Sequence, residues 1–444
     1  MKRRTFNQLL RQLALAQIVL PPVLQACGRE EEIFVPYDGH IAIIGAGAAG
    51  LYAADLLLSK GYSCSVYEAS NRIGGRLAKN ESFADFPIDL GAQWLHGKKN
   101  LLGDLIQQTN TATQEDDSEI WFWHGQQLRK NLPKDLFGLF ERENQLPDIS
   151  FQDFATQNGF DASYQYLVEA IAGDSGASGD NISTFWKIKE EENWSSGDQD
   201  YKFARTYFDL IHDHLAPSVL PYLQLETPIT KIDYSGEEIQ LTAANGARFT
   251  ADKVILTVPI SILKAGMIQF TPALSETQSQ AFQKIGMEAG MKVFLKFSQS
   301  FYKENLLGGQ ICAAYIDERV GKTGNDHVLL AFLMGQQARD LAARGSDTAI
   351  IQALLGELDQ IYDGQASRYF QQGLVKNWAA EPYIQGAYSY STIGMGNARK
   401  EAARSAGNKI YFAGEAMNTN GHHQTVFGAA ETGKTAVEKL LKEI

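Results

Sequence analysis

The chain has 444 residues, of which 44% are hydrophobic and 21% charged, so it is long enough for about two domains with separate cores. Its formal net charge of −12 argues against nucleic-acid binding and is compatible with a cationic substrate. The sequence shows no internal repeat, and short acidic runs such as 190–192 are typical of solvated surfaces.

The first 26 residues are predicted to be an export signal. Basic residues 2–4 precede a modest apolar segment, 9–24, that is too short and polar for a stable membrane span. The paired arginines resemble a twin-arginine signal, and the segment ending at Ala26-Cys27 resembles a bacterial lipobox, in which the cysteine is lipidated after cleavage. We therefore expect an exported protein, periplasmic or held at the membrane by a lipid anchor. The alternative is an amphipathic helix that stays on the chain.

A dinucleotide-binding motif follows the first predicted strand, His40–Ile44. In Gly45-Ala46-Gly47-Ala48-Ala49-Gly50, the first glycine allows a tight turn, the second lets the backbone approach a pyrophosphate, and the third lets the next helix pack on the sheet. The free N–H groups of that helix would face the phosphates. A second predicted strand, Cys64–Tyr67, ends at Glu68, where a carboxylate can accept hydrogen bonds from the ribose hydroxyls.

The residues after Glu68 indicate which dinucleotide is bound. Arg72-Ile73-Gly74-Gly75-Arg76 suits a loop around a diphosphate, with Arg76 as its bidentate partner; the alternative is a solvated basic turn. The stretch from Glu68 to Arg76 resembles the second fingerprint of the flavin amine oxidases, the family of monoamine oxidases, polyamine oxidases and lysine-specific histone demethylases. That resemblance implies FAD, and it extends from about residue 39 to residue 444.

Further blocks carry the same resemblance, which is strongest to the polyamine oxidases. The blocks are 89–97 (Asp-Leu-Gly-Ala-Gln-Trp-Leu-His-Gly), 292–297, and 378–429 with its Gly-Ala-Tyr-Ser and Ala-Gly-Glu segments. Motif and resemblance together imply cofactor contacts from Gly45, Gly47, Ala49, Gly50, Glu68, Ala69, Arg76, Gly91, Ala92, Gln93, Trp94, Ile229, Trp378, Gly386, Ala387, Gly414, Glu415, Thr425 and Val426. Monoamine oxidases have a flavin-linked cysteine where this chain has Ala387, so we expect non-covalent FAD.

The resemblance also implies four catalytic residues. Lys292 matches the family lysine that holds a water against flavin N5; from spacing alone it would be an edge-strand lysine. His96 matches a residue at the polyamine oxidase active-site mouth, although a lone histidine is usually structural. Tyr388 matches one wall of an aromatic cage in front of the flavin. Thr425 aligns with the opposite wall, where monoamine oxidases have a second tyrosine.

The expected fold is α/β, with a Rossmann-like FAD-binding domain and an inserted α+β substrate domain. The FAD-binding domain is assigned to residues 39–100, 218–270 and 376–444, and the substrate domain to 101–217 and 271–375. Alternating segments at 240–250 and 254–259 are predicted to be strands beside the first dinucleotide unit.

No metal site is expected, because the adjacent His422 and His423 diverge and no third ligand is apparent. Cys64 and Cys312 could in principle form a disulfide, but a buried strand position for Cys64 makes packing the better interpretation. The predicted function is oxidation of a primary or secondary, polyamine-like amine, with O2 reduced to H2O2. The alternatives are an L-amino-acid oxidase and a flavin-containing binding protein with little turnover. Amine length, the C–N bond cleaved and the oligomeric state are not indicated.

Overall fold

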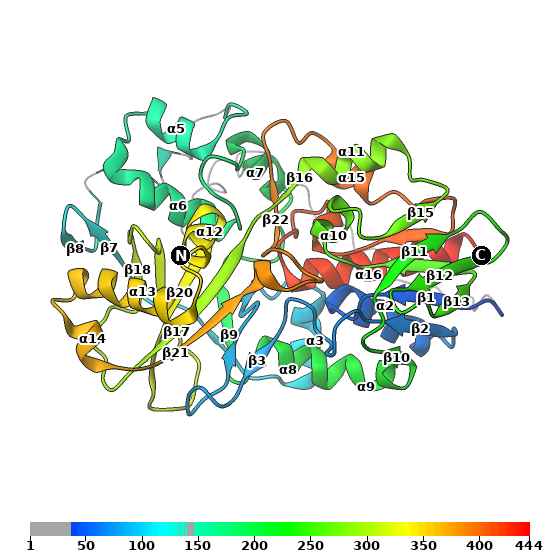
Figure 1. Cartoon of the computed structure of the whole chain (residues 1–444), viewed down its shortest axis with the longest axis horizontal. Helices are drawn as coiled ribbons and strands as arrows, with labels where there is room; N and C mark the ends of the chain where they lie inside the picture. The colour runs from blue at the N-terminus through cyan, green and yellow to red at the C-terminus, as the bar shows by residue number, and fades with distance from the viewer. Residues whose placement is uncertain (1–36, 133, 137, 140–145) are drawn as a thin grey trace, which may run out of the picture.

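A five-stranded parallel sheet forms one end of the molecule in the computed structural model, which describes residues 37–132, 134–136, 138–139 and 146–444 (Figure 1). The predicted export signal, residues 1–26 with Cys27 after it, lies outside the described residues. The sheet order is β10-β2-β1-β14-β23, and every neighbouring pair is parallel. Its strands are β1 (Ile41–Ile44), β2 (Cys64–Tyr67), β10 (Leu223–Gln224), β14 (Lys253–Leu256) and β23 (Ile410–Phe412). All of β1 is buried, as expected for a parallel strand covered on both faces.

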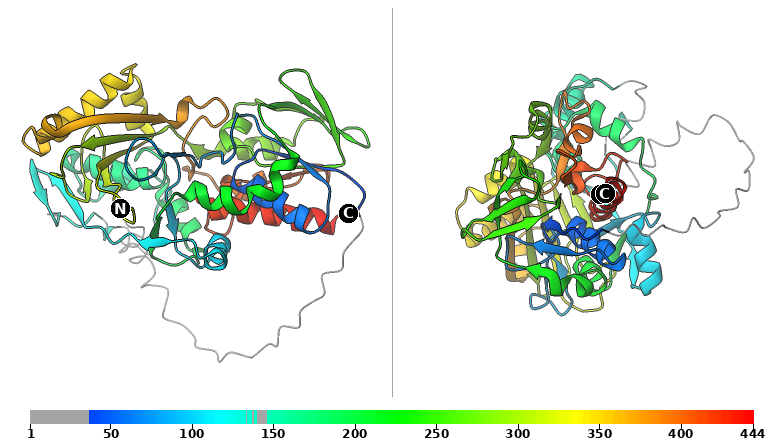
Figure 2. Two further views of the ribbon diagram at one scale, coloured as in Figure 1. Left: turned by 90° about the horizontal axis from the view of Figure 1, so that it is seen from below. Right: turned by 90° about the vertical axis from the view of Figure 1, so that its right-hand side faces the viewer.

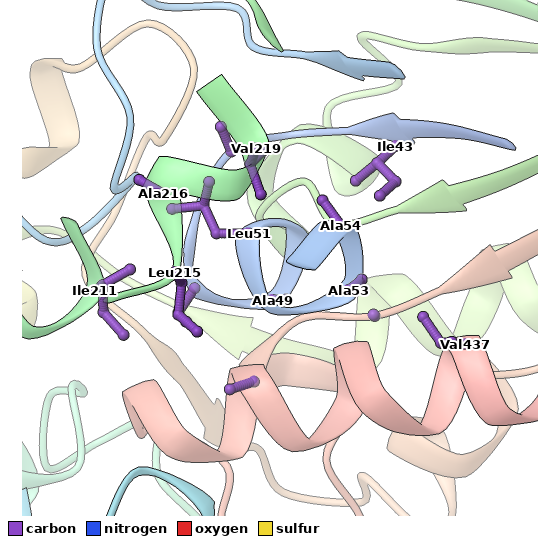
Figure 3. Packing of buried hydrophobic residues seen from close by; sticks show 14 of the residues in the cluster. Ile43, Ala49, Leu51, Ala53, Ala54, Ile211, Leu215, Ala216, Val219 and Val437 are labelled. Atoms are coloured by element: carbon purple, nitrogen blue, oxygen red, sulfur yellow. The ribbon is translucent and has the colours of Figure 1, made fainter. Parts of the chain in front are cut away.

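One face of this sheet is covered by helices. Ile41 and Ile43 of β1 pack in a hydrophobic cluster with side chains from α2 (Ala48–Ser59), α3 (Leu101–Thr109), α8 (Tyr207–His214), α9 (Ala216–Val219) and α16 (Val426–Lys442). Figure 3 shows Leu51, Ala53 and Ala54 of α2 among these neighbours. Helices α2 and α16 approach closely, because a Cβ at Gly433 would lie 2.3 Å from the carbonyl oxygen of Ala49. Small residues therefore set the spacing of the two helices.

The other face packs against a separate four-stranded sheet of order β13-β12-β11-β15, through a second hydrophobic cluster. These elements are β11 (Ile229–Asp233), β12 (Ile239–Ala243), β13 (Arg248–Ala251), β15 (Gln269–Thr271), α10 (Ile260–Lys264), α11 (Glu276–Lys284) and α15 (Ala398–Ala402). The predicted strand at 240–250 is thus two strands joined by a turn, where Gly246 has a φ of +86°. It belongs to this sheet, whereas the segment near 254 joins the parallel sheet as predicted.

A seven-stranded sheet of order β21-β17-β20-β19-β18-β7-β8 occupies the other end of the molecule (Figures 1 and 2). Its strands are β7 (Ile120–His124), β8 (Gln127–Arg129), β17 (Gly290–Phe297), β18 (Asn305–Leu307), β19 (Ala314–Asp317), β20 (His327–Met334) and β21 (Phe370–Asn377). Alternate residues of β17, from Met291 to Phe297, pack in one cluster with α12 (Gly335–Ala342), α13 (Asp347–Ile361) and α14 (Gln365–Tyr369). The period of two turns Lys292 to the opposite face.

Shorter elements connect these parts. The helices α5 (Phe151–Gln157), α6 (Gln165–Asp174) and α7 (Thr184–Glu191) are accompanied by the 3₁₀ turns η1 (Ala162–Tyr164), η2 (Leu220–Tyr222), η3 (Trp378–Ala380) and η4 (Glu415–Met417). The remaining strands are β3 (Lys79–Asn80), β4 (Ile88–Asp89), β5 (Trp94–His96), β6 (Thr113–Glu115), β9 (Asp200–Phe203), β16 (Ile285–Met287) and β22 (Ser389–Ser391). None of the helices in the described ranges is long and apolar enough to cross a bilayer.

The packing differs from the predicted domain division at three places. Buried side chains of α3 and α8, which the sequence assigned to the substrate domain, belong to the cluster around β1 and α2. Helix α11, at 276–284, was also assigned to the substrate domain, but its buried side chains belong to the cluster on the other face of the parallel sheet. Amphipathic helices look alike wherever they dock, so the sequence pattern cannot say which core they join. The division into two domains stays a prediction.

Candidate functional site

A cavity of about 670 Å³ lies between the carboxyl end of the parallel sheet and the face of the seven-stranded sheet that carries Lys292. Its volume is in the range of small-molecule and cofactor sites. Every predicted site residue lines this cavity except Gly50 and Gly386. Those two glycines allow close backbone packing instead. A Cβ on Gly50 would lie 1.9 Å from the backbone oxygen of Gly45, and a Cβ on Gly386 would lie 2.9 Å from the backbone oxygen of Glu288.

The glycine-rich turn at the start of α2 fits a dinucleotide. Gly45 has a φ of +106°, which favours glycine, and Gly50 packs on it as described above. A Cβ on Gly47 would meet nothing within 4 Å and would enter the cavity. Helix α2 begins without a side-chain cap or an acidic residue in its first turn, so its free N–H groups suit an anionic diphosphate.

Glu68 lies at the carboxyl end of β2 and is held by the protein. Its Oε2 accepts from the backbone N–H of Ala46 at 2.7 Å, and its Oε1 accepts from the N–H and hydroxyl of Ser70 at 2.9 and 2.7 Å. Ala69 and Ile229, at the start of β11, line the same part of the cavity. These bonds fix the carboxylate beside the glycine-rich turn, where a ribose would lie.

The two arginines of the 72–76 loop have different partners. Arg72 donates to the backbone oxygens of Ile73, Gly75 and Leu77, so it shapes the loop and is not a solvated turn residue. Arg76 donates to the backbone oxygen of Ala387 at 2.9 Å and pairs with Glu415 at 2.8 Å.

Glu415 connects the 72–76 loop, through Arg76, to the start of β22. Burial alone would raise its pKa, but Arg76 and Arg399 outweigh this effect and lower the pKa. Its carboxylate also accepts from the N–H and hydroxyl of Ser389 and from the N–H of Gln424. Glu415 thus meets Arg76 at the cavity wall, which Gly414 and Trp378 also line. The indole N–H of Trp378 donates to the backbone oxygen of Leu90.

Lys292 is buried in the cavity wall. Its strand, β17, lies between β21 and β20, so the edge-strand interpretation is wrong. The ammonium donates to the backbone oxygen of Asp89 at 3.0 Å and to the side-chain oxygen of Gln93. Burial lowers its pKa, while Glu318 and Asp89 oppose the effect.

The block at 91–94 brings Gln93 and Trp94 to the same wall. A Cβ on Gly91 would lie 1.9 Å from the oxygen of Arg76, so only glycine fits there. The backbone N–H of Ala92 also bonds to that oxygen, at 3.2 Å. The side-chain oxygen of Gln93 accepts a hydrogen bond from Lys292, and its side-chain nitrogen donates one to Glu318.

Tyr388 and Thr425 both face the cavity in front of Lys292's wall. The Tyr388 hydroxyl points at the backbone oxygens of Gly173 and Asp174, 3.1 and 3.2 Å away, which fixes the ring. Thr425 is the N-cap of α16: its hydroxyl accepts from the N–H of Gly428 and donates to the oxygen of His422. The threonine hydroxyl therefore already has a structural role, which the motif alignment did not indicate.

His96 and several carboxylates lie at the substrate end of the cavity. His96 Nδ1 is 2.7 Å from Asp200 on the paired strand β9. Asp116 accepts from the indole N–H of Trp94 at 2.9 Å; burial alone would raise its pKa, but Lys202 and the hydrogen bonds outweigh this and lower it. Asp174 lines the cavity as well. Sequence reasoning missed these three carboxylates, because no motif surrounds them and only the fold brings them together.

Other sequence interpretations can be compared with the structure. Among the described residues, no group of three or more His, Cys, Asp or Glu side chains could hold a metal ion. Cys64 and Cys312 are free and buried in different cores. The prediction that the 190–192 run is solvated is wrong for two residues: Glu190 pairs with Arg399 at 2.7 Å, and Glu191 pairs with Lys187.

Comparison with known proteins shows which family the chain is similar to. The model of the flavin-containing amine oxidoreductase family matches residues 48–141 and 134–441. Lysine-specific histone demethylase 2 of Homo sapiens is 28% identical, and the match covers 92% of this chain and 54% of that protein. Polyamine oxidase 2 of Arabidopsis thaliana is 26% identical over 90% of this chain and 87% of its own. The chain spans about half the length of the first two curated relatives that it matches, both of them histone demethylases.

The fold is similar to that of a solved amine oxidase. The structure of cyclohexylamine oxidase from Brevibacterium oxydans IH-35A superimposes with a TM-score of 0.76 and 20% identity, covering 91% of this chain and 100% of that one.

Proposed function

The chain belongs to the family of flavin-containing amine oxidoreductases, with FAD as its cofactor, and we propose that it oxidises a primary or secondary, polyamine-like amine with O2. The glycine-rich turn with its open space at Gly47, the anchored carboxylate of Glu68 and the uncapped N-terminus of α2 fit the dinucleotide. Ala387 lines the cavity and has no thiol, so the flavin is held without a thioether bond.

The charge of the substrate end carries the proposal. Asp116, Asp174 and Asp200 line the cavity there, which favours a ligand with an additional ammonium group. Among the described lining residues the only guanidinium groups are those of Arg72 and Arg76, and both bind protein groups at the phosphate end. An L-amino-acid oxidase needs a guanidinium for the substrate carboxylate, so this alternative is disfavoured.

The protein must bind the reacting nitrogen in its neutral form. An alkylammonium with a pKa near 10.4 loses its proton at neutral pH at a cost of about 5 kcal/mol. Desolvation beside Tyr388, Phe332 and Met334, which line the cavity, disfavours the cation and lowers that cost. His96, paired with Asp200, is placed to accept a hydrogen bond or a proton from the amine.

The net reaction converts a CH–NH unit and O2 into an imine and H2O2, and water then hydrolyses the imine to an aldehyde and an amine. FAD, when bound, accepts the hydride equivalent and returns two electrons to O2. We propose that Lys292 holds water at the reacting edge and that Tyr388 aligns the amine. Two finer proposals rest on sequence alone: residues 1–26 form a twin-arginine export signal, and Cys27 carries a lipid that anchors the chain in the periplasm.

Anaerobic mixing of the FAD-loaded protein with a panel of diamines, polyamines, monoamines and L-amino acids tests the function. Diamines or polyamines should bleach the flavin absorbance within seconds, and admitting O2 should release H2O2. Amino acids should bleach it at least about 100-fold more slowly, because no free guanidinium pairs their carboxylate. Faster bleaching by amino acids would favour the L-amino-acid oxidase, and no bleaching by any amine would favour a binding protein.

A further inference from the structure

The Lys292 ammonium is connected to the buried carboxylate of Glu318 by hydrogen bonds through the side-chain amide of Gln93. The side-chain oxygen of Gln93 accepts from Lys292, and the side-chain nitrogen of Gln93 donates to Glu318 at 2.9 Å. Lys292, Gln93 and Glu318 are 4%, 3% and 1% exposed, respectively. Because one end of the amide is fixed by a carboxylate that can only accept, its oxygen must point at the ammonium.

The buried charges around Lys292 come from three other segments. Asp89 lies in β4, Lys202 lies in β9, and Glu318 and Lys322 lie in the loop after β19. Lys202 lies 4.0 Å from Glu318, and Lys322 lies 3.9 Å from Asp89. Three ammonium groups thus share two carboxylates, so the loss of either carboxylate would increase the excess of positive charge in a buried place.

Trp94 separates two of these ammonium groups. The ring centroid is 5.4 Å from Lys202 and 5.8 Å from Lys292, and the indole N–H is bound to Asp116. The ammonium of Lys292 donates to the backbone oxygen of Asp89 and to the side-chain oxygen of Gln93. The side-chain nitrogen of Gln93 in turn donates to the carboxylate of Glu318.

We propose that Glu318, acting through Gln93, is a positioning residue that keeps the Lys292 ammonium oriented and protonated for the reduction of O2. The inference rests on the proposed function. Reduction of O2 to H2O2 takes the hydride equivalent carried by reduced FAD and one proton from solvent, and negative charge develops on oxygen before that proton arrives. A fixed ammonium stabilises this charge, whereas a neutral amine does not.

A titration of Lys292 tests the inference without any catalysis. In the FAD-loaded protein with ¹³Cε-labelled lysine, the Lys292 resonance is identified by its loss in Lys292→Met. Glu318→Gln keeps the shape and the acceptor oxygen but removes the charge, so the titration midpoint should fall by at least about one pH unit. A midpoint within about 0.3 units of the parent value would overturn the inference.

The pH profile of flavin reoxidation gives a second measurement. Light with a chemical donor reduces the flavin, so no amine is needed, and rapid mixing with O2 follows reoxidation. The parent rate should fall as pH rises through the pKa of Lys292. In Glu318→Gln this fall should begin about one unit lower, with the low-pH rate within about twofold of the parent. An unshifted profile would mean that Glu318 is only structural.

Two further variants keep the test informative if Glu318→Gln loses its flavin. Gln93→Leu breaks the amide link and leaves both charges, so the low-pH reoxidation rate should drop at least about fivefold; an unchanged rate and midpoint would contradict the inference. Glu357→Gln neutralises a buried glutamate bound to Tyr315 and Cys312, away from the cavity, and should match the parent. Failure to oxidise any amine would refute the proposed function but leave these lysine measurements intact.

Discussion

Gly47 and Gly50 are three residues apart in one motif but have different physical roles. A Cβ at Gly50 would lie 1.9 Å from the backbone oxygen of Gly45, inside van der Waals contact. A Cβ at Gly47 would touch no protein atom within 4 Å and would enter the cavity. The cofactor therefore requires glycine at position 47, and the packing of α2 on β1 requires glycine at position 50.

Gly47→Val should therefore separate cofactor binding from folding. Gly47 has a φ of −80°, which a branched residue tolerates, so the fold should survive while the side chain fills the diphosphate position. We expect a soluble protein of parent-like circular dichroism with less than about a tenth of the parent FAD content. The matched variant Gly50→Val should instead unfold at lower urea concentration or fail to accumulate. Full flavin in purified Gly47→Val would refute the dinucleotide assignment.

At the residue scale, the sequence predicted the cavity wall better than the partners within it. The predicted contacts at Gly45, Glu68 and Lys292 face one cavity, because short motifs with fixed local geometry carry them. The bond between Arg76 and Glu415 joins residues 339 positions apart. Neither that pair nor the bonds of Asp116 to Trp94 and of Asp200 to His96 leave a local pattern, so only tertiary packing could show them.

The N-cap of helix α16 is Thr425, a residue that the motif alignment placed in the active site. Thr425→Ala removes the hydroxyl that bonds to the N–H of Gly428, and should destabilise the protein by about 1 kcal/mol. Thr425→Ser keeps the cap and should lose less than about 0.5 kcal/mol. Urea unfolding of both variants measures the difference. Equal stability of Thr425→Ala and the parent would show that the cap is not important to the fold.

Helix α6 introduces a pH dependence near the cavity. Burial raises the pKa of Glu169 to about 7, although the N–H of Gly179 donates to it at 3.1 Å. Because the folded pKa lies above the unfolded value of about 4.3, the folded state binds the proton more tightly. Its contribution to stability is complete below the unfolded pKa and is lost as pH rises through about 7.

Glu169→Gln should remove that loss. The variant should be more stable than the parent at pH 8, by on the order of 2 kcal/mol, and similar to it near pH 4. Unfolding free energies at several pH values check this. Parallel curves for the two proteins would mean that Glu169 titrates normally in the folded state.

At the element scale, strands with strong local patterns were predictable and their partners were not. The segments Cys64–Tyr67 and Lys292–Phe297 are strands as expected, within one or two residues. The alternation at 240–250 correctly indicated extended backbone, but a hydrophobic alternation does not say which sheet the strand joins. The interior position of β17 likewise depends on β20 and β21, which follow it by 30 residues or more in the chain.

The whole molecule cannot complete its cofactor site until nearly all of the chain is made. The parallel sheet takes strands from Ile41 to Phe412, and α16, at 426–442, packs against α2. A protein of this topology that binds a cytosolic cofactor is best exported after folding, which is the condition that a twin-arginine signal meets. The topology therefore suits the export route proposed from residues 1–28.

Cleavage before Cys27 is the prediction at this scale. Removal of residues 1–26 takes away Lys2, Arg3, Arg4 and Arg11 and no acidic residue, so the formal net charge changes from −12 to about −16. The intact mass of the membrane-extracted protein should match a chain that begins at Cys27 and carries a lipid. Replacing both Arg3 and Arg4 with lysine keeps the charge but breaks the paired-arginine motif, and should leave the precursor in the cytoplasm with FAD bound. Because a transporter of folded proteins reads the arginine pair and not the charge alone, equal export of the double-lysine variant would contradict this route. An unmodified chain beginning at Met1 would contradict cleavage itself.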